Sequence, residues 1–415
     1  MYLNWISLGI LIITIVVGVM KKWNVGILAV AMAFILGKIG GISESDILSG
    51  FNSSLFLMLL GVMFLFGVAQ TNGTMELFAK KVIALVGHRA FLVPWIIYLV
   101  SVIISAIGPG SLATLVLVSV LAVSLAKEIK VSPLLMAAMA FFGTCVGGVS
   151  PIASDGIIAG TLATEQGVEG LPGMTFFITA LIGVTIIVIC LYFKLGGHKI
   201  RLDTTVETEK LPAFNLAQKL TLLGIVALVI ITLVLGFNVG LTAFVIAIVL
   251  LLFRAGDEKK VLGSIGWSTL ILVTGFSVLM NVITQLGGIA LLSNLLSQLM
   301  TKTLAPFVMS LSSSILGMVC SVSGVVMPTM ISAVPDIIAN IGADHRELIV
   351  AVVTGSHVGG ITPITGGALL LSAYVTICKP TEQEQRKFYV NLFLMAFFAA
   401  GVMAVLGLIG LFGIF

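Results

Sequence analysis

Long apolar runs separated by short polar loops make up most of this chain. Eight of these runs are close to the roughly 20 residues that a helix needs to cross a bilayer. They lie at residues 3–20, 25–42, 51–70, 174–193, 220–236, 239–253, 268–285 and 388–411. The pattern predicts an all-α polytopic membrane protein, because helices satisfy their own backbone hydrogen bonds in lipid.

Two further apolar regions, residues 94–126 and 306–338, are interrupted near their middle. The interruptions read Gly-Pro-Gly-Ser at 108–111 and Ser-Val-Ser-Gly at 321–324. Each arm of the first region reaches roughly 21–23 Å, which is short of the roughly 30 Å hydrocarbon core. We therefore expect two re-entrant hairpins, each preceded by an amphipathic surface segment, at residues 75–86 and 289–300.

A ten-residue sequence occurs twice, at an offset of 212 residues. Gly-Thr-Cys-Val-Gly-Gly-Val-Ser-Pro-Ile at 143–152 recurs as Gly-Ser-His-Val-Gly-Gly-Ile-Thr-Pro-Ile at 355–364. Glycine and proline inside an apolar run interrupt a helix. We therefore expect two broken helices, at residues 133–164 and 348–378, which is how many transporters build a site at the middle of the membrane.

The segments follow the same order in both halves of the chain. This order predicts a first repeat at residues 1–195, a polar linker at 196–217 and a second repeat at 218–415. Each half crosses the membrane five times, which gives about ten transmembrane segments, and an odd number inverts the second repeat. The linker is interpreted as a solvated connector rather than a regulatory site.

The distribution of basic residues gives the orientation. If the loop that holds Lys21 is cytoplasmic, all of the 21 Lys and Arg except Lys38, Lys302 and Arg346 lie on the cytoplasmic side. Positive residues favour that side. We therefore expect both termini outside the cell, in a multi-pass protein of the plasma (inner) membrane. The first hairpin then opens to the cytoplasm and the second to the exterior.

Composition excludes several other classes of protein. Hydrophobic residues make up 59% of the chain and charged residues 9%, against about 25% charged residues in a soluble domain. The net charge of +4 is explained by the loops and does not indicate nucleic-acid binding. The four cysteines form no CxxC pair, and no metal-ligand cluster, nucleophile triad or phosphate loop indicates an enzyme. No cofactor is expected beyond a coupling ion.

The hairpin tips and helix breaks supply the candidate site. Carbonyl groups freed at a break suit a hard cation, and N–H groups at the start of a half-helix suit an anion. The predicted substrate-binding residues are Gly110, Ser111, Thr114, Ser150, Ser323, Gly324, Thr329, His357, Thr362 and Thr365. The predicted cation-binding residues are Gly147, Ser154, Asp155, Gly359 and Gly360. A single such glycine is also what close helix packing uses, but the duplication favours a site.

The two ionisable residues of this set have no equivalent at offset 212. Asp155 corresponds to Gly367, and His357 corresponds to Cys145. A carboxylate within a membrane is a functional candidate, and for Asp155 three roles stay open: Na⁺ binding, proton carriage, or capping of the half-helix that follows. His357 either donates to a substrate carboxylate, changes charge with pH, or is a buried structural histidine.

The chain also resembles a known family. Its motifs are Gly-Phe-Asn-Ser-Ser-Leu-Phe at 50–56, Ala-Gln-Thr-Asn-Gly at 69–73, Ile-Gly-Pro-Gly at 107–110, Ala-Lys-Glu at 126–128, Ser-Pro-Leu-Leu at 132–135 and Gly-Gly-Val-Ser-Pro-Ile at 147–152. These are similar to the malonate/dicarboxylate carrier family of the ion transporter superfamily, to which divalent-anion/Na⁺ symporters are related. The resemblance, which is strongest over residues 1–200, implies an elevator-type carrier and a homodimer.

One departure from the superfamily concerns the hairpin tips. The divalent-anion symporters carry Ser-Asn-Thr there, whereas this chain has Gly-Ser-Leu-Ala-Thr at 110–114 and Val-Ser-Gly at 322–324. Without the asparagine, neither the Na⁺ stoichiometry nor the dicarboxylate specificity carries over.

Three function hypotheses follow. The first is a secondary active carrier of a small carboxylate, such as malonate or succinate, driven by Na⁺ or H⁺. No Lys or Arg falls in a predicted membrane core, so helix ends, hydroxyls and the co-bound cation would hold the anion. The second is a Na⁺/H⁺ antiporter with Asp155 as the exchanging group. The third is an intramembrane aspartyl protease, which needs two carboxylates in one site; Asp336 is the only second acid near a predicted core.

Overall fold

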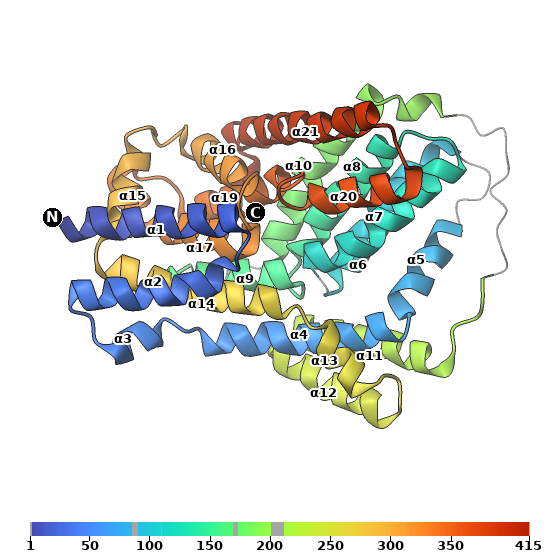
Figure 1. Ribbon diagram of the computed structural model, residues 1–415, viewed down its shortest axis with the longest axis horizontal. Helices are drawn as coiled ribbons and strands as arrows, with labels where there is room; N and C mark the ends of the chain where they lie inside the picture. Colours follow the sequence, from blue (N-terminus) through green and yellow to red (C-terminus); the bar gives the residue numbers. More distant parts are fainter. Residues whose placement is uncertain (1, 85–89, 109, 169–172, 201–210, 415) are drawn as a thin grey trace.

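The computed structural model describes residues 2–84, 90–108, 110–168, 173–200 and 211–414, and every regular element in these ranges is helical (Figure 1). The elements of the first half are α1 (Tyr2–Lys21), α2 (Val25–Gly40), α3 (Glu44–Ser49), α4 (Ser53–Thr71), α5 (Thr74–Ala84), η1 (Ala90–Leu92), α6 (Val93–Ala106), α7 (Gly110–Glu128), α8 (Pro133–Gly148), α9 (Ser154–Glu165), α10 (Gly173–Lys194) and η2 (Gly197–Lys199).

The second half repeats this order. Its elements are α11 (Leu216–Leu233), α12 (Val239–Leu252), α13 (Glu258–Ser264), α14 (Trp267–Gln285), α15 (Gly288–Ser297), α16 (Ala305–Gly317), η3 (Val322–Val326), α17 (Met327–Ser332), α18 (Val334–Ile341), α19 (His345–Gly359), α20 (Gly367–Cys378), α21 (Glu382–Leu408) and η4 (Leu411–Gly413). Residues 201–210 of the predicted linker lie outside the described residues.

The predicted spans are confirmed as helices. The eight spans correspond to α1, α2, α4, α10, α11, α12, α14 and α21. Seven helical segments in the described part of the chain are long and apolar enough to cross a membrane, and shorter apolar helices accompany them. The protein is therefore a multi-pass membrane protein. The last span begins six residues earlier than expected, because Thr381 and Glu384 form a capping box that extends α21 to Glu382.

Two short helices were not predicted. In α3, the Ser43 hydroxyl accepts a hydrogen bond from the backbone N–H of Asp46 at 3.1 Å. In α13, the Asp257 carboxylate accepts one from the backbone N–H of Lys260, also at 3.1 Å. These caps stabilise helices of six and seven residues, which are too short to give a periodic apolar pattern.

The two hairpins and the two broken helices are present. The first hairpin consists of α6 and α7, and Pro109 at its tip lies outside the described residues. The second consists of α16 and the run η3–α17–α18, whose tip is one π-helical turn capped by Ser321. The broken helices are α8 with α9 and α19 with α20. The surface segments α5 and α15 precede the hairpins as expected.

The two halves pack by the same contacts, most clearly at their glycines. A Cβ atom on Gly147 would lie 2.3 Å from the carbonyl oxygen of Val102, and one on Gly359 would lie 2.1 Å from that of Ser314. Both pairs are related by the offset of 212. These glycines bring each broken helix against the first arm of its own hairpin, α8 on α6 and α19 on α16.

The contacts divide the helices into two bundles. The spanning bundle consists of α1–α4 and α11–α14, in which α2 packs on α14 and α4 packs on α12. The hairpin bundle consists of α6–α10 and α16–α21. In Figure 1, α2, α4, α12 and α14 lie below α7, α8, α20 and α21. The surface helices join the bundles, since α5 contacts α4 and α6 while α15 contacts α1 and α18.

Candidate functional site

A pocket of about 780 Å³ lies between the two bundles. The spanning bundle contributes the end of α1, the α1–α2 loop and the start of α14. The hairpin bundle contributes both hairpin tips and both broken helices. The polar side chains among its lining residues are those of Lys22, Trp23, Asn24, Ser111, Thr144, Cys145, Ser268, Cys320, Ser321, Ser323, His357 and Thr365. A mainly apolar cavity with a few convergent polar groups is typical of a small-molecule site.

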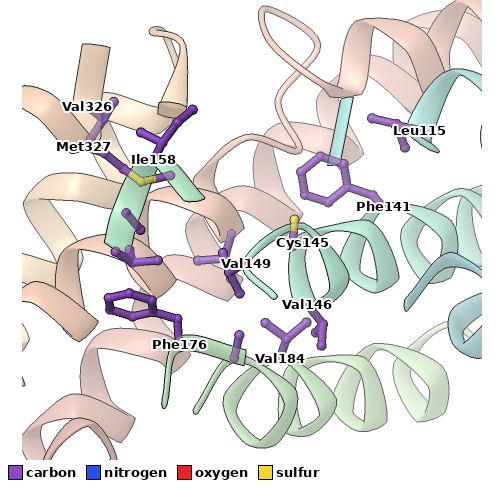
Figure 2. Packing of buried hydrophobic residues seen from close by; sticks show 14 of the residues in the cluster. Leu115, Phe141, Cys145, Val146, Val149, Ile158, Phe176, Val184, Val326 and Met327 are labelled. Carbon is purple, nitrogen blue, oxygen red and sulfur yellow. The ribbon is translucent and has the colours of Figure 1, made fainter. Parts of the chain in front are cut away.

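Apolar side chains form the walls on the hairpin-bundle side. Leu115 on α7 and Phe141 on α8 line the pocket, and Figure 2 shows their side chains beside Cys145. Both residues also approach Gly366, where an added Cβ would lie 2.9 Å from the Phe141 ring and 3.3 Å from Leu115. These contacts fix the start of α20 against the first hairpin, so that both repeats shape one cavity.

The two hairpin tips meet at the carboxylate of Asp155. From the first tip, the hydroxyl of Ser111 donates to Asp155 Oδ2, and the backbone N–H of Ser111 lies 3.3 Å from the same oxygen. From the second tip, the hydroxyl of Ser323 donates to Oδ1 at 2.7 Å. Asp155 is 5% exposed. Its charge is therefore balanced by hydrogen-bond donors and by the N-termini of α7 and α9, since helix N-termini favour anions.

The second broken helix reaches the same carboxylate through His357. Its Nε2 lies 3.4 Å from Asp155 Oδ2, and its Nδ1 lies 2.7 Å from the carbonyl oxygen of Val353, one turn earlier in α19. The ring is 5% exposed. Asp155 thus joins three separate elements that are far apart in sequence: α7, η3 and α19.

Asp155 stands behind the pocket wall. Ser111, Ser323 and His357 line the pocket and contact Asp155, whereas Asp155 is not among the described lining residues. A ligand in the pocket therefore meets the same three side chains that hold Asp155. Because each hydroxyl has a single proton to donate, a bound anion and Asp155 compete for these donors.

The capping role considered for Asp155 is wrong. Helix α9 begins at Ser154, its N-cap is Ala153, and no side chain caps it. Asp155 lies in the first turn, but its oxygens accept from Ser111 and Ser323 and lie beside His357 Nε2, rather than accepting from α9 itself. The sequence places the acid beside a break, but only the fold shows that both hairpin tips reach it.

Two predicted hydroxyls hold the breaks together. The hydroxyl of Ser150 donates to the carbonyl of Ala106, and that of Thr362 donates to the carbonyl of Met318. Both the donors and the acceptors are related by the offset of 212. Neither Ser150 nor Thr362 lines the pocket in the described chain. These two hydrogen bonds link each helix break to its own hairpin.

Apart from Gly147 and Gly359, the remaining predicted residues divide into two groups. Thr365 and Gly360 line the pocket, and Thr365 donates to the carbonyl of Gly360 at 2.9 Å. Five residues are not among its described lining residues: Gly110, Ser154, Thr114, Gly324 and Thr329. Gly110 has a φ of 78°, and a Cβ there would lie 2.0 Å from Ser154 Oγ. Glycine is therefore required at the start of α7.

The predicted cation-binding residues make contacts within the protein. Both carboxylate oxygens of Asp155 accept hydrogen bonds, and the hydroxyl of Thr365 donates to the carbonyl of Gly360. The glycines at 147 and 359 are explained by helix packing. The described residues contain no group of three or more His, Cys, Asp or Glu side chains that could hold a metal ion.

Sequence reasoning missed one charged residue. Lys22 follows the C-terminus of α1 with a φ of 55°, and it is the one Lys or Arg among the described lining residues. Its neighbour Lys21 ends α1 and does not line the pocket. The sequence shows both as loop charges, and no local signal distinguishes them. One positive charge of the α1–α2 loop thus lines the pocket.

The comparison with protein families finds a match to the first part of the chain. Residues 1–148 match the family model described as the dicarboxylate carrier protein MatC N-terminus. The resemblance inferred from the motifs is thereby confirmed over this part of the chain. Among curated proteins, no match is found.

Solved structures agree on the fold. The chain is similar to the YdaH transporter of Alcanivorax borkumensis, with a TM-score of 0.60 and 15% sequence identity over 88% of this chain and 87% of that one. The family model describes a carrier, and the solved structure is that of a transporter. The fold of this chain is therefore that of a polytopic membrane transporter. In the described part of the chain, the contacts of Asp155 are hydroxyls, a backbone N–H and an imidazole, whereas an aspartyl protease needs a second carboxylate.

Proposed function

We propose that this transporter is a secondary active carrier of a small carboxylate, with malonate and succinate as the first candidates, coupled to Na⁺ or H⁺. The observation that carries the proposal is the meeting of Ser111, Ser323 and His357 in one pocket. Hydroxyl donors near helix N-termini, such as those of Ser111 and Ser323, suit a carboxylate. The match of residues 1–148 to a dicarboxylate carrier model supports this substrate class.

The position of the pocket supports an elevator-type mechanism. It is lined by both bundles, and among the described helices the bundles meet through the short surface helices α5 and α15 and through contacts of α4 with α9 and of α14 with η3 and α17. We infer that the hairpin bundle moves with the substrate against the spanning bundle, which would form the contact in a homodimer. In the plasma membrane, with both termini outside, Lys22 lies on the cytoplasmic side. With this orientation, the α1–α2 loop that lines the pocket is a cytoplasmic loop.

Asp155 gives a physical reason for coupling. Its carboxylate and a bound carboxylate share the donors Ser111 and Ser323, and two anions near each other in a low dielectric repel strongly. A cation that neutralises Asp155 removes this repulsion. Transport without the cation is then unfavourable, which is the requirement for a symporter.

Uptake by proteoliposomes tests the proposal. Purified protein is reconstituted, and accumulation of labelled malonate and succinate is measured with a Na⁺ gradient, with a pH gradient, and with neither. We expect accumulation only with one of the gradients. Absence of gradient-dependent uptake across a panel of mono- and dicarboxylates would reject the carrier function.

The alternative is a Na⁺/H⁺ antiporter of the same architecture, which the burial of Asp155 favours. It predicts proton release from vesicles on addition of Na⁺ alone, and loss of this release in Asp155→Asn. Carboxylate-dependent uptake without Na⁺-dependent proton release would decide for the carrier.

A further inference from the structure

The hydrogen bond at His357 Nδ1 determines where the protons of the ring lie. The carbonyl oxygen of Val353 can only accept a hydrogen bond, so Nδ1, at 2.7 Å, carries a proton and donates it. In a neutral imidazole only one nitrogen is protonated. The other nitrogen, Nε2, then has a lone pair that points away from the ring.

That lone pair faces a carboxylate oxygen. Nε2 lies 3.4 Å from Asp155 Oδ2, and both atoms are acceptors if the ring is neutral and the carboxyl group is ionised. Such a contact is repulsive, and both groups are buried. A proton between the two atoms turns the repulsion into a charge-assisted hydrogen bond. At 3.4 Å the two atoms are close enough to share one proton, and such a proton would relieve the repulsion.

We propose that the coupling ion of this transporter is a proton, held between His357 Nε2 and Asp155 Oδ2, and that it binds before the substrate anion. This inference rests on the proposed carrier function. Uptake of one proton changes the charge of the pair from −1 to zero, and no covalent bond other than the N–H or O–H bond forms or breaks. On release at the other side of the membrane, the same proton leaves to water.

The same geometry explains why the proton favours the substrate. While Asp155 is ionised, the hydroxyls of Ser111 and Ser323 donate to it. When the shared proton moves onto Asp155, the carboxyl group needs these donors less, and they can turn to a carboxylate in the pocket that they line. The proton thus removes a negative charge and frees two donors in one step.

Few other titratable groups act on the pair. The Cys145 thiol on α8 lies 3.4 Å from the carbonyl of His357, and Lys22 lines the same pocket. Three elements that pack on α19 carry no titratable side chain: α16, α17 and η3. Helix α18, which also packs on α19, carries Asp336. The titratable residues of α10 lie in its last five positions: Cys190, Tyr192 and Lys194. Those of α21 lie in its first eight positions: Glu382, Glu384, Arg386, Lys387 and Tyr389.

The first experiment observes the pair without substrate or transport. The chain has four histidines, so the protein is labelled with ¹⁵N-histidine, and His357→Gln assigns the His357 signals. We expect Nδ1 to stay protonated and Nε2 to lose its proton as the pH rises, with the transition displaced in Asp155→Asn. A bare Nε2 at every pH at which the protein is folded, unaffected by Asp155→Asn, would overturn the proposal.

The second experiment measures coupling with malonate and succinate as probes. In Na⁺-free proteoliposomes, an inward proton gradient should drive accumulation by the natural protein. Asp155→Asn should lose accumulation at least tenfold yet keep substrate exchange, because its uncharged pair needs no proton. His357→Gln leaves the charge of Asp155 without its proton partner and should lose both accumulation and exchange at least tenfold. The matched controls are Asp336→Asn, another acid of the hairpin bundle, and His345→Gln, at the start of the same helix α19; both should behave like the natural protein.

The outcomes separate the two proposals. Accumulation that requires Na⁺ and does not change with pH would reject the proton and keep the carrier. Failure to transport any carboxylate would reject the carrier, while the histidine spectra still decide whether the pair holds a proton. If Asp155→Asn does not fold, His357→Gln and the spectra of the natural protein carry the test.

Discussion

The two helix breaks have the same backbone design and different chemistry. At both, a hydroxyl donates to a hairpin carbonyl, from Ser150 to Ala106 and from Thr362 to Met318. They differ where the first break has Asp155 and the second has Gly367. The shared residues build the scaffold and supply the paired donors Ser111 and Ser323, and the residues without an equivalent, Asp155 and His357, add the ionisable groups of the site. The repeat therefore indicates where to look, and its mismatches indicate what the site does.

Symmetry cannot be restored by substitution. At Gly367 an added Cβ would lie 2.0 Å from the carbonyl oxygen of Ile361, so the second break has no room for an equivalent of Asp155. On the other side, Cys145 on α8 contacts the backbone of its own counterpart, His357. The two breaks meet at this point, and the acid of one repeat faces the histidine of the other.

The largest effect is expected from the glycines that both halves share. Gly147→Ala and Gly359→Ala place a Cβ within 2.3 Å of a backbone carbonyl oxygen. Overpacking of this kind costs about 1–3 kcal/mol or more, so we expect little folded protein and a lower melting temperature in detergent. Gly160→Ala on α9, where nothing lies within 4 Å, is the control and should be neutral. Normal stability of both variants would contradict the packing.

The hairpin-tip serines should show the next largest effect, on affinity rather than on folding. Ser111→Ala and Ser323→Ala each remove a donor that faces both Asp155 and the pocket. A hydrogen bond to a charged group contributes about 1.5–3 kcal/mol, so the KM for malonate or succinate should rise about 10- to 100-fold. Ser119→Ala removes a hydroxyl of α7 that bonds to Val116 at 3.2 Å and should leave KM unchanged. Equal effects of all three would mean that the tips only stabilise the fold.

The paired hydroxyls test whether the breaks are equivalent. Ser150→Ala and Thr362→Val each leave a carbonyl without its donor, which costs about 1–3 kcal/mol when the group is buried. We expect similar losses of thermal stability in both variants. The exchanges Ser150→Thr and Thr362→Ser keep the hydroxyl and should restore most of the stability. A loss confined to one repeat would show that the breaks differ in energy as well as in chemistry.

Much of the fold could be predicted, because membrane helices leave strong local signals. Apolar length locates the spans, and the offset of 212 locates both breaks. The prediction failed at α3 and α13, whose stability comes from single side-chain caps in short polar loops. It also placed the start of α21 too late, since the first turns of that helix are polar. Short capped helices carry no periodic pattern to detect.

The site could be predicted only in part. The differences between the two repeats drew attention to Asp155 and His357. Their contact, however, joins residues 202 positions apart and depends on how the two repeats pack. The same holds for Ser111 and Ser323, which were expected to bind substrate and also hold Asp155. Lys22 was missed because its role depends on the loop conformation, and Lys21 beside it has the same local sequence character.

The smallest effect is expected at these two lysines. Lys22→Gln removes the positive charge that lines the pocket, whereas Lys21→Gln removes an identical charge from the same loop but not from the lining. An exposed charge acts through solvent, so we expect a KM increase of about two- to fivefold for Lys22→Gln that disappears at high salt. Lys21→Gln should leave KM unchanged at all salt concentrations, and both variants keep enough basic residues for the same orientation.

Because the two variants have equal net charge, a difference in KM between them measures the effect of the position of the charge. Equal KM values at low salt would show that the spanning bundle attracts the anion only through the total charge of its loop, and that recognition belongs to the hairpin bundle alone.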